Sequence, residues 1–156
     1  MKALRVLEIL CVLLTVGFIV LVTRHEPPSE TSAADMASAL LSVTDVSELH
    51  ECKNAEFKRE FQLNPNDYDG VVFYSSDSIM EVRELLVVKL SDEAQGETLV
   101  ERIRGRVEDK ITLFNGYAPE QEALLDGYVL EHTRGFVLFA VCDEPEAVRQ
   151  TFKDTL

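Results

Sequence analysis

The chain has 156 residues, of which 28 are acidic and 15 are basic, giving a formal net charge of −13 at pH 7. Three of the basic residues and one of the acidic residues precede His25, so residues 25–156 carry a net charge of −15. That charge repels nucleic-acid phosphates and anionic lipid headgroups, which excludes nucleic-acid binding as a function class. An apolar content of 46% excludes a disordered chain.

Residues 1–24 are predicted to form a single transmembrane helix. Their apolar run extends from Ile9 to Val22, preceded by Lys2 and Arg5 and followed by Arg24. A membrane span needs about 20 predominantly apolar residues, and residues 3–22 reach that length only by including Arg5 and Glu8 near one end, where their charges can reach water. The N-terminal helix is therefore expected to hold the protein at the cell membrane.

Two alternatives for this segment stay open, a cleaved signal peptide and a buried helix of a soluble domain. The best cleavage sequence, Ser32-Ala33-Ala34, lies well past the apolar run, and the run shows no polar face. More positive charge precedes the run than follows it, so the positive-inside bias predicts a cytoplasmic N-terminus. We expect a single-pass membrane protein whose domain is extracytoplasmic.

Residues 25–34 are predicted to be a linker, because Pro27-Pro28 forbids helix continuation and no large apolar residue follows within it. The acidic domain then covers residues 35–156. Short amphipathic helices are predicted over residues 36–43 and 54–63 from the spacing of their apolar residues.

The central part of the domain changes to a β pattern. Strands are predicted at residues 71–74 and 85–90, both rich in β-branched or aromatic residues. A long helix follows from Ser91, its expected cap, to Phe114, with large apolar residues spaced three and four positions apart. A shorter helix is predicted over residues 119–125, with Pro119 near its start.

Two further strands are predicted at residues 128–132 and 136–142, joined as a hairpin by the turn at residues 133–135. Asp143 and Glu146 are expected to cap the last helix, which continues through Phe152. Four strands with hairpin-like links favour an antiparallel sheet covered by helices. The predicted fold is α+β, a two-layer sandwich with an antiparallel sheet of about four strands.

Cys52 and Cys142 are the two cysteines outside the predicted membrane segment. An external location would allow a disulfide between them, and the alternative is two half-buried free thiols. His50, Cys52, His132 and Cys142 could ligate zinc, but they lack the close spacing of zinc motifs. The acidic turn before Gly70 lacks the first and last ligands of a calcium loop. No metal and no other cofactor is predicted.

Catalysis by Ser75, Ser76 or Ser78 would need a nearby base, and His50 and His132 are the candidates. The chain has neither a GxSxG elbow nor an SxxK motif, and a Ser/Asp-rich connection is typical of an ordinary turn. No catalytic residue is therefore assigned.

Three segments resemble the uncharacterised bacterial family known as domain of unknown function 4358. They are residues 64–89, with NPNDYDGVVFYSSDSIMEVRELLVVK, residues 116–121, with GYAPEQ, and residues 135–139, with GFVLF. Members of that family resemble small membrane-anchored or lipoprotein-like surface proteins of Gram-positive bacteria, which implies an external domain. The resemblance implies no reaction and no ligand, and it marks five positions as candidate site residues: Tyr74, Met80, Glu84, Tyr117 and Gln121.

The function expected from these observations is a non-catalytic binding or protein-interaction module. Its partner would be an envelope protein or ligand, and its candidate binding residues are Tyr74, Ser75, Asp77, Met80, Glu84, Tyr117 and Gln121. Tyr117 could either contact a partner or simply cover the end of the core. The alternative is an enzyme or enzyme-accessory domain acting on cell-envelope material, with Ser75, Ser76, Asp77, Glu84 and Tyr117 as its polar cluster.

Overall fold

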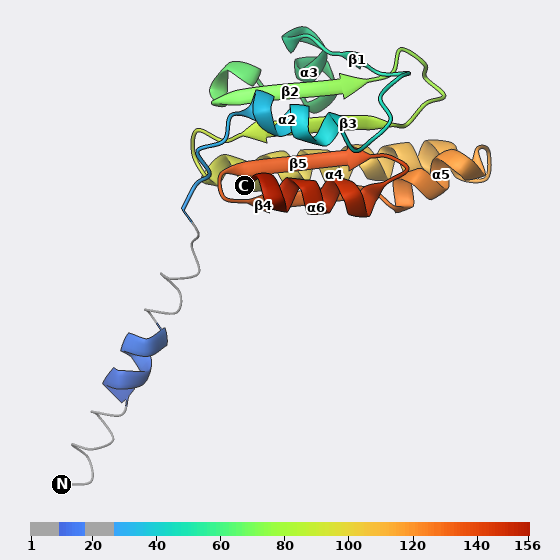
Figure 1. Ribbon diagram of the computed structural model, residues 1–156. Helices are drawn as coiled ribbons and strands as arrows, with labels where there is room; N and C mark the ends of the chain where they lie inside the picture. The colour runs from blue at the N-terminus through green and yellow to red at the C-terminus, as the bar shows by residue number, and fades with distance from the viewer. Residues whose placement is uncertain (1–9, 18–26) are drawn as a thin grey trace, which may run out of the picture.

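The computed structural model describes residues 10–17 and 27–156 (Figure 1). Residues 10–17 are helical, and the remainder of the predicted transmembrane helix lies outside the described residues. Within the described ranges, no helix combines the length and the apolar character that crossing a membrane requires.

The domain is built on a five-stranded antiparallel sheet with the strand order β1-β2-β3-β5-β4. The strands are β1 (His50–Glu51), β2 (Gly70–Ser75), β3 (Glu84–Lys89), β4 (Val129–Thr133) and β5 (Phe136–Val141). All four predicted strands are confirmed to within two residues at each end. The additional strand, β1, pairs only two residues with β2, a length too short to produce a periodic signal in the sequence.

Helices cover both faces of this sheet, so the predicted two-layer arrangement is wrong and the domain has three layers (Figure 1). The helices are α2 (Ala33–Leu41), α3 (Asn54–Phe61), the 3-10 turn η1 (Pro65–Asp67), α4 (Ala94–Phe114), α5 (Pro119–Asp126) and α6 (Pro145–Thr155). The two central strands are buried on both faces, as in Leu85–Val88 and Phe136–Val141. Their unbroken apolar runs are typical of strands covered twice, whereas alternation is typical of strands covered once.

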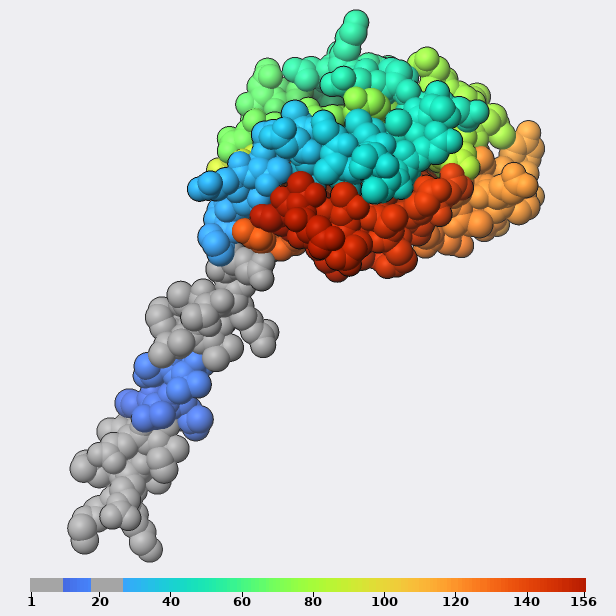
Figure 2. All heavy atoms as spheres, viewed as in Figure 1, coloured from blue at the N-terminus to red at the C-terminus, as the bar shows by residue number. Residues whose placement is uncertain are grey.

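Each face of the sheet has its own apolar core. Helices α3, α4 and α5 cover one face, where Leu86, Val88 and Phe139 point. Helices α2 and α6 cover the other face, where Leu85 and Val87 point, and they lie side by side in the space-filling view (Figure 2). The largest buried helix residues are Phe57, Phe61, Leu99 and Ile103 on the first face, and Met36, Leu40 and Phe152 on the second.

Two predicted helix caps are replaced by longer-range contacts. Helix α4 begins at Ala94 rather than Ser91, because the Ser91 hydroxyl donates a 2.7 Å hydrogen bond to Asp69 instead. Asp143 does not cap α6, because its carboxylate binds the guanidinium of Arg83 at 2.8 Å and 3.1 Å. Both side chains therefore join segments far apart in the sequence.

The chain enters the domain at the end of the sheet where β4 turns into β5. Ser29 donates its backbone N–H to the Arg134 carbonyl at 2.8 Å and its hydroxyl to the Leu156 carbonyl at 2.9 Å. Thr31 likewise donates its hydroxyl to the carbonyl of Thr155. The segment predicted as a linker thus joins the folded domain from Ser29 onward. The opposite end of the sheet, marked by Ser75 and Glu84, lies about 20 Å away, which is the length of a six-residue strand.

Candidate functional site

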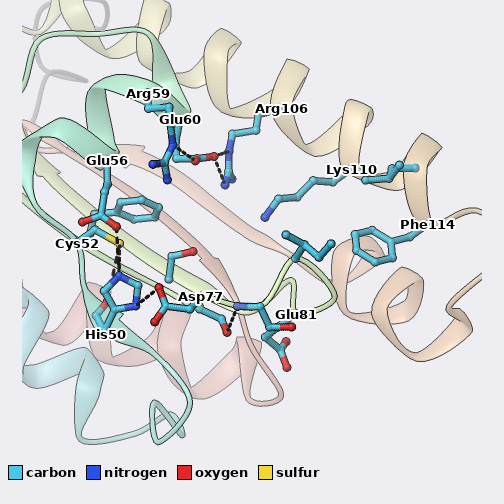
Figure 3. A pocket seen from close by; sticks show the side chains of 16 residues that line it. His50, Cys52, Glu56, Arg59, Glu60, Asp77, Glu81, Arg106, Lys110 and Phe114 are labelled. Carbon is cyan, nitrogen blue, oxygen red and sulfur yellow. Dashed lines mark hydrogen bonds and ion pairs between the residues drawn. The ribbon is translucent and has the colours of Figure 1, made fainter.

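A pocket of about 320 Å³ opens at this far end of the sheet (Figure 3). One wall comes from β1 and α3, the second from the later turns of α4, and the third from the connection between β2 and β3. Its volume is at the lower limit of small-ligand sites, which occupy about 300–1,000 Å³. The pocket is therefore large enough for one side chain of a partner or for a small polar molecule.

A buried carboxylate organises the α4 wall. The side chain of Glu84 is fully buried, and its Oε1 accepts hydrogen bonds from Arg106 Nη1 at 2.6 Å and from Lys110 Nζ at 3.0 Å. Arg106 also donates to Glu60 Oε2 at 3.1 Å, and its guanidinium lies 5.1 Å from the centre of the Phe61 ring. Positions 106 and 110 are one helical turn apart, so both cations reach the same carboxylate.

The charges of this network stabilise one another. Burial alone would lower the pKa of Arg106, but the carboxylates of Glu84 and Glu60 outweigh it and raise that pKa above its usual value. Burial likewise favours the protonated form of Glu60, and the opposing effect of Arg106 leaves the Glu60 pKa below its usual value. Arg106 and Glu60 therefore stabilise each other's charged forms, and both side chains line the pocket.

The opposite wall gathers an imidazole, a thiol and two carboxylates. His50 Nε2 lies 3.2 Å from Glu56 Oε1 and 3.8 Å from Cys52 Sγ, while His50 Nδ1 lies 3.7 Å from Asp77 Oδ1. Figure 3 shows these side chains facing Arg106 and Lys110 across the pocket. Both nitrogens of the imidazole thus face carboxylates rather than the hydroxyl of a serine.

The pKa values of the Cys52 thiol and the Glu56 carboxyl on this wall are shifted in opposite directions. Burial, reinforced by the negative charge of Glu56, raises the pKa of Cys52 to about 11. The backbone N–H of Lys53, which donates to Glu56 at 2.7 Å, and then His50 lower the pKa of Glu56. At neutral pH Cys52 is a thiol and Glu56 a carboxylate.

Two exposed apolar side chains line the pocket, and two others lie within four positions of them in the chain. Ile79, in the β2–β3 connection, is 89% exposed, and Leu113, near the end of α4, is 72% exposed; both line the pocket. Met80 and Tyr117 are also exposed and belong to the same connection and to the α4–α5 corner. We refer to Ile79, Met80, Leu113 and Tyr117 as the apolar rim.

The structure brings some of the predicted site residues together and separates others. Ser75 and Asp77 line the pocket, and Glu84 lies behind Arg106 and Lys110. Tyr74 packs on the other face of the sheet with the residues of α2 and α6. Adjacent residues in a strand point to opposite faces, so Tyr74 and Ser75 cannot belong to the same site.

The remaining predicted residues, Met80, Tyr117 and Gln121, are not among the residues that line the pocket. Met80 and Tyr117 belong to the apolar rim, and the exposure of Tyr117, 74%, is inconsistent with a ring that covers the core. Gln121 accepts a 3.0 Å hydrogen bond from the backbone N–H of Val82 through Oε1, which ties α5 to the β2–β3 connection. Binding by any of these residues stays a prediction.

Arg106 and Lys110 were not among the predicted site residues, although the sequence contains a signal for them. Both are charged residues that flank the buried stripe of Ile103 and Val107 on α4, a position where a charge usually has a buried partner. His50 and Cys52 were considered as ligands with His132 and Cys142, but the structure unites them with Glu56 instead.

The disulfide between Cys52 and Cys142 is not formed, and both thiols are free. Cys52 packs against the core beneath α3 and α4, whereas Cys142 belongs to the core beneath α2 and α6. The sheet lies between these two cores and separates the two thiols, as the alternative prediction of two free cysteines expected.

The fold and the pocket define a small acidic α+β domain with a polar site at the end of its sheet that is remote from the N-terminal segment. A model of the family described as domain of unknown function (DUF4358) matches residues 42–142, well over half of the chain. The protein therefore belongs to this family. No curated protein and no solved structure matches the chain.

Proposed function

We propose that this protein is a membrane-anchored, extracytoplasmic and non-catalytic protein-interaction module that binds a basic envelope protein at the apolar rim. The observation that carries the proposal is the position of the exposed apolar side chains. In residues 27–156, the exposed large apolar side chains all belong to the rim. Apolar side chains gathered at one place on a surface are typical of interaction sites, whereas scattered ones are not.

The position of the rim supports this role. The N-terminal segment enters at the β4–β5 turn, and the rim lies at the opposite end of the strands (Figure 1). A domain held at a membrane by its N-terminal helix would thus present the rim away from the bilayer. The apolar side chains would remain accessible to a protein rather than to lipid.

The charge of the domain specifies the partner's chemistry. A net charge of −13 for the chain attracts a basic protein and increases its rate of association at low ionic strength. Arg106 and Lys110 also line the pocket, and although both contact Glu84, an acidic side chain next to the partner's apolar anchor would find two cations there. A partner whose surface is positively charged, and which carries an acidic residue next to an apolar one at the point of contact, would match both the charge of the domain and the pocket.

The alternative role, an enzyme acting on envelope material, has less support in the arrangement of side chains. Its predicted cluster is divided, because Ser75 and Asp77 line the pocket while Tyr117 points into solvent. His50 faces Glu56 and Asp77, so it is oriented by carboxylates and not paired with a serine nucleophile.

The experiment compares capture of membrane proteins by three forms of the full chain in mild detergent. Ile79→Ser with Leu113→Ser removes half of the rim, and Gln150→Ser, on the exposed side of α6, is the matched control. We expect a basic protein to be retained by the wild type and the control, lost by the double variant, and released by salt. Thermal melts establish that all three forms are folded.

Two results would contradict the proposal. Retention of the same partner by the folded double variant would show that binding does not use the rim. Turnover of isolated envelope material by the wild type, with loss of turnover in Asp77→Asn, would instead support the enzyme alternative.

A further inference from the structure

Three potential metal ligands lie together on the β1–α3 wall of the pocket. His50 Nε2, Cys52 Sγ and a carboxylate oxygen of Glu56 are all within 4.8 Å of one another. We propose that these three side chains bind a zinc ion whose fourth coordination position faces the pocket. This proposal is independent of the apolar rim and of any protein partner.

The distances between the ligand atoms fit tetrahedral zinc. With its usual bond lengths, zinc holds a nitrogen and an oxygen ligand about 3.3 Å apart, and a nitrogen and a sulfur ligand about 3.6 Å apart. His50 Nε2 lies 3.2 Å from Glu56 Oε1 and 3.8 Å from Cys52 Sγ. The third pair, Cys52 Sγ and the Glu56 oxygen, lies within 4.8 Å, so side-chain rotations that bring these two atoms together would complete the tetrahedral set.

The backbone of each ligand is fixed by its neighbours. His50 is held in β1, opposite Ser75 of β2, and the Cys52 N–H donates a 2.8 Å hydrogen bond to the Phe73 carbonyl. Glu56 is held in the first turn of α3, where its second carboxylate oxygen, Oε2, accepts from the Lys53 N–H. Such preorganisation reduces the entropy lost when a metal binds.

Asp77 provides the outer-sphere partner that metal-bound histidines commonly have. Its Oδ1 lies 3.7 Å from His50 Nδ1, on the side of the ring that faces away from Cys52 and Glu56. A carboxylate there favours a proton on Nδ1, which leaves the lone pair of Nε2 directed toward the metal. The role expected of Asp77 is therefore to orient His50 rather than to bind the ion.

The ligand types select the metal. A thiolate and an imidazole favour zinc over magnesium or calcium, which prefer oxygen ligands alone. On binding, Cys52 releases its proton to solvent and the zinc–sulfur bond takes its place. Three protein ligands with an open fourth position are typical of zinc sites that hold water or an exchangeable ligand, and here that position is directed into the pocket.

The test uses cobalt(II) and zinc with the purified full chain in detergent. Cobalt(II) reports a tetrahedral thiolate site through its visible bands and through a sulfur-to-metal charge-transfer band in the near ultraviolet. We expect one equivalent of cobalt to produce these bands and one equivalent of zinc to abolish them. Cys52→Ser should lose the charge-transfer band, whereas the matched controls Cys142→Ser and Cys11→Ser should keep it.

A chelator competition then measures zinc affinity in the variant of the orienting residue. Asp77→Asn should weaken zinc binding by about 10–100-fold without a change in the melting temperature of the metal-free protein. His50→Gln provides a second ligand variant should Cys52→Ser not fold, since this imidazole is partly exposed.

Absence of the charge-transfer band in the wild type would overturn the proposal. Its persistence in both Cys52→Ser and His50→Gln would do the same. Equal zinc affinity in the wild type and Asp77→Asn would overturn the orienting role of Asp77.

Discussion

Removal of Arg106 should destabilise the domain more than the removal of any exposed arginine on the same helix. Arg106→Met deletes the 2.6 Å contact with Glu84, whose side chain is fully buried, and the contact with Glu60. Loss of one partner of a buried ion pair typically costs about 3–5 kcal/mol, because the remaining charge is left without compensation. Lys110 still contacts Glu84, so we expect a loss near the lower limit, about 3 kcal/mol.

The measurement is urea denaturation of the full chain, followed by circular dichroism. Arg104→Met is the matched control, since Arg104 is exposed on α4, and it should change the free energy of unfolding by less than about 0.5 kcal/mol. Against a typical domain stability of about 5–15 kcal/mol, the Arg106→Met effect is easily resolved. In a thermal melt it corresponds to a decrease on the order of 10 °C.

A double variant tests whether the loss arises from the unpaired carboxylate. Glu84→Met with Arg106→Met removes both buried charges, and Lys110 can turn its ammonium group toward water because it is partly exposed. The double variant should therefore be more stable than Arg106→Met alone. Equal costs for Arg106→Met and Arg104→Met, or a double variant whose cost equals the sum of the single costs, would refute the reasoning.

Three further predictions concern α4, acid stability and topology. Gly96→Ala should destabilise the domain by about 1–3 kcal/mol, because a Cβ at this position would collide with the His132 imidazole. Gly105→Ala, which faces open space on the same helix, should instead stabilise it by about 0.5–1 kcal/mol. Urea melts in which both variants change stability in the same direction would contradict this prediction. Arg83 lowers the pKa of Asp143, so this pair stabilises the domain above the ordinary Asp pKa of about 3.9, and that contribution is lost as the pH falls below this value. Asp143→Asn should therefore reduce the decrease in melting temperature on acidification. An unchanged profile of melting temperature against pH would show that the pair does not contribute to acid unfolding. Gln150→Cys places a thiol on the exposed side of α6 that should react with a membrane-impermeant maleimide on intact cells, while reaction only after lysis would reverse the proposed orientation.

Local patterns in the sequence were sufficient for most of the individual elements, the two-residue strand β1 being the exception. Turn residues before β2, the apolar spacing of α4 and the short β4–β5 turn each depend on neighbours a few positions apart, and all three appear where expected. The turn between β4 and β5 has two residues with positive φ, Arg134 at 50° and Gly135 at 78°, as a tight hairpin requires. The family was also identifiable, because its segments are continuous in the chain.

The number of layers and the pocket could not be obtained in the same way. Helices α2 and α6 lie more than 100 positions apart in the chain but pack side by side on one face, and only the doubly buried strands indicated this second layer. The pocket likewise depends on residues from different elements: Glu56 and Asp77 both contact His50, and Glu84 contacts Lys110, which lies 26 positions further along the chain. Side chains that come together through the sheet register leave no signature of fixed spacing.

The bonds of Ser29 and Thr31 to the last two residues and to the β4–β5 turn have a mechanical consequence. A pulling force on the N-terminal segment would enter the domain where residues 29–31 bond the C-terminal residues and the β4–β5 turn. The force would be divided among several hydrogen bonds that must break together. It would therefore not separate the strands of the sheet one at a time. Force applied through the N-terminal segment would then enter the domain at one end of the sheet, a strand length away from the pocket at the other end.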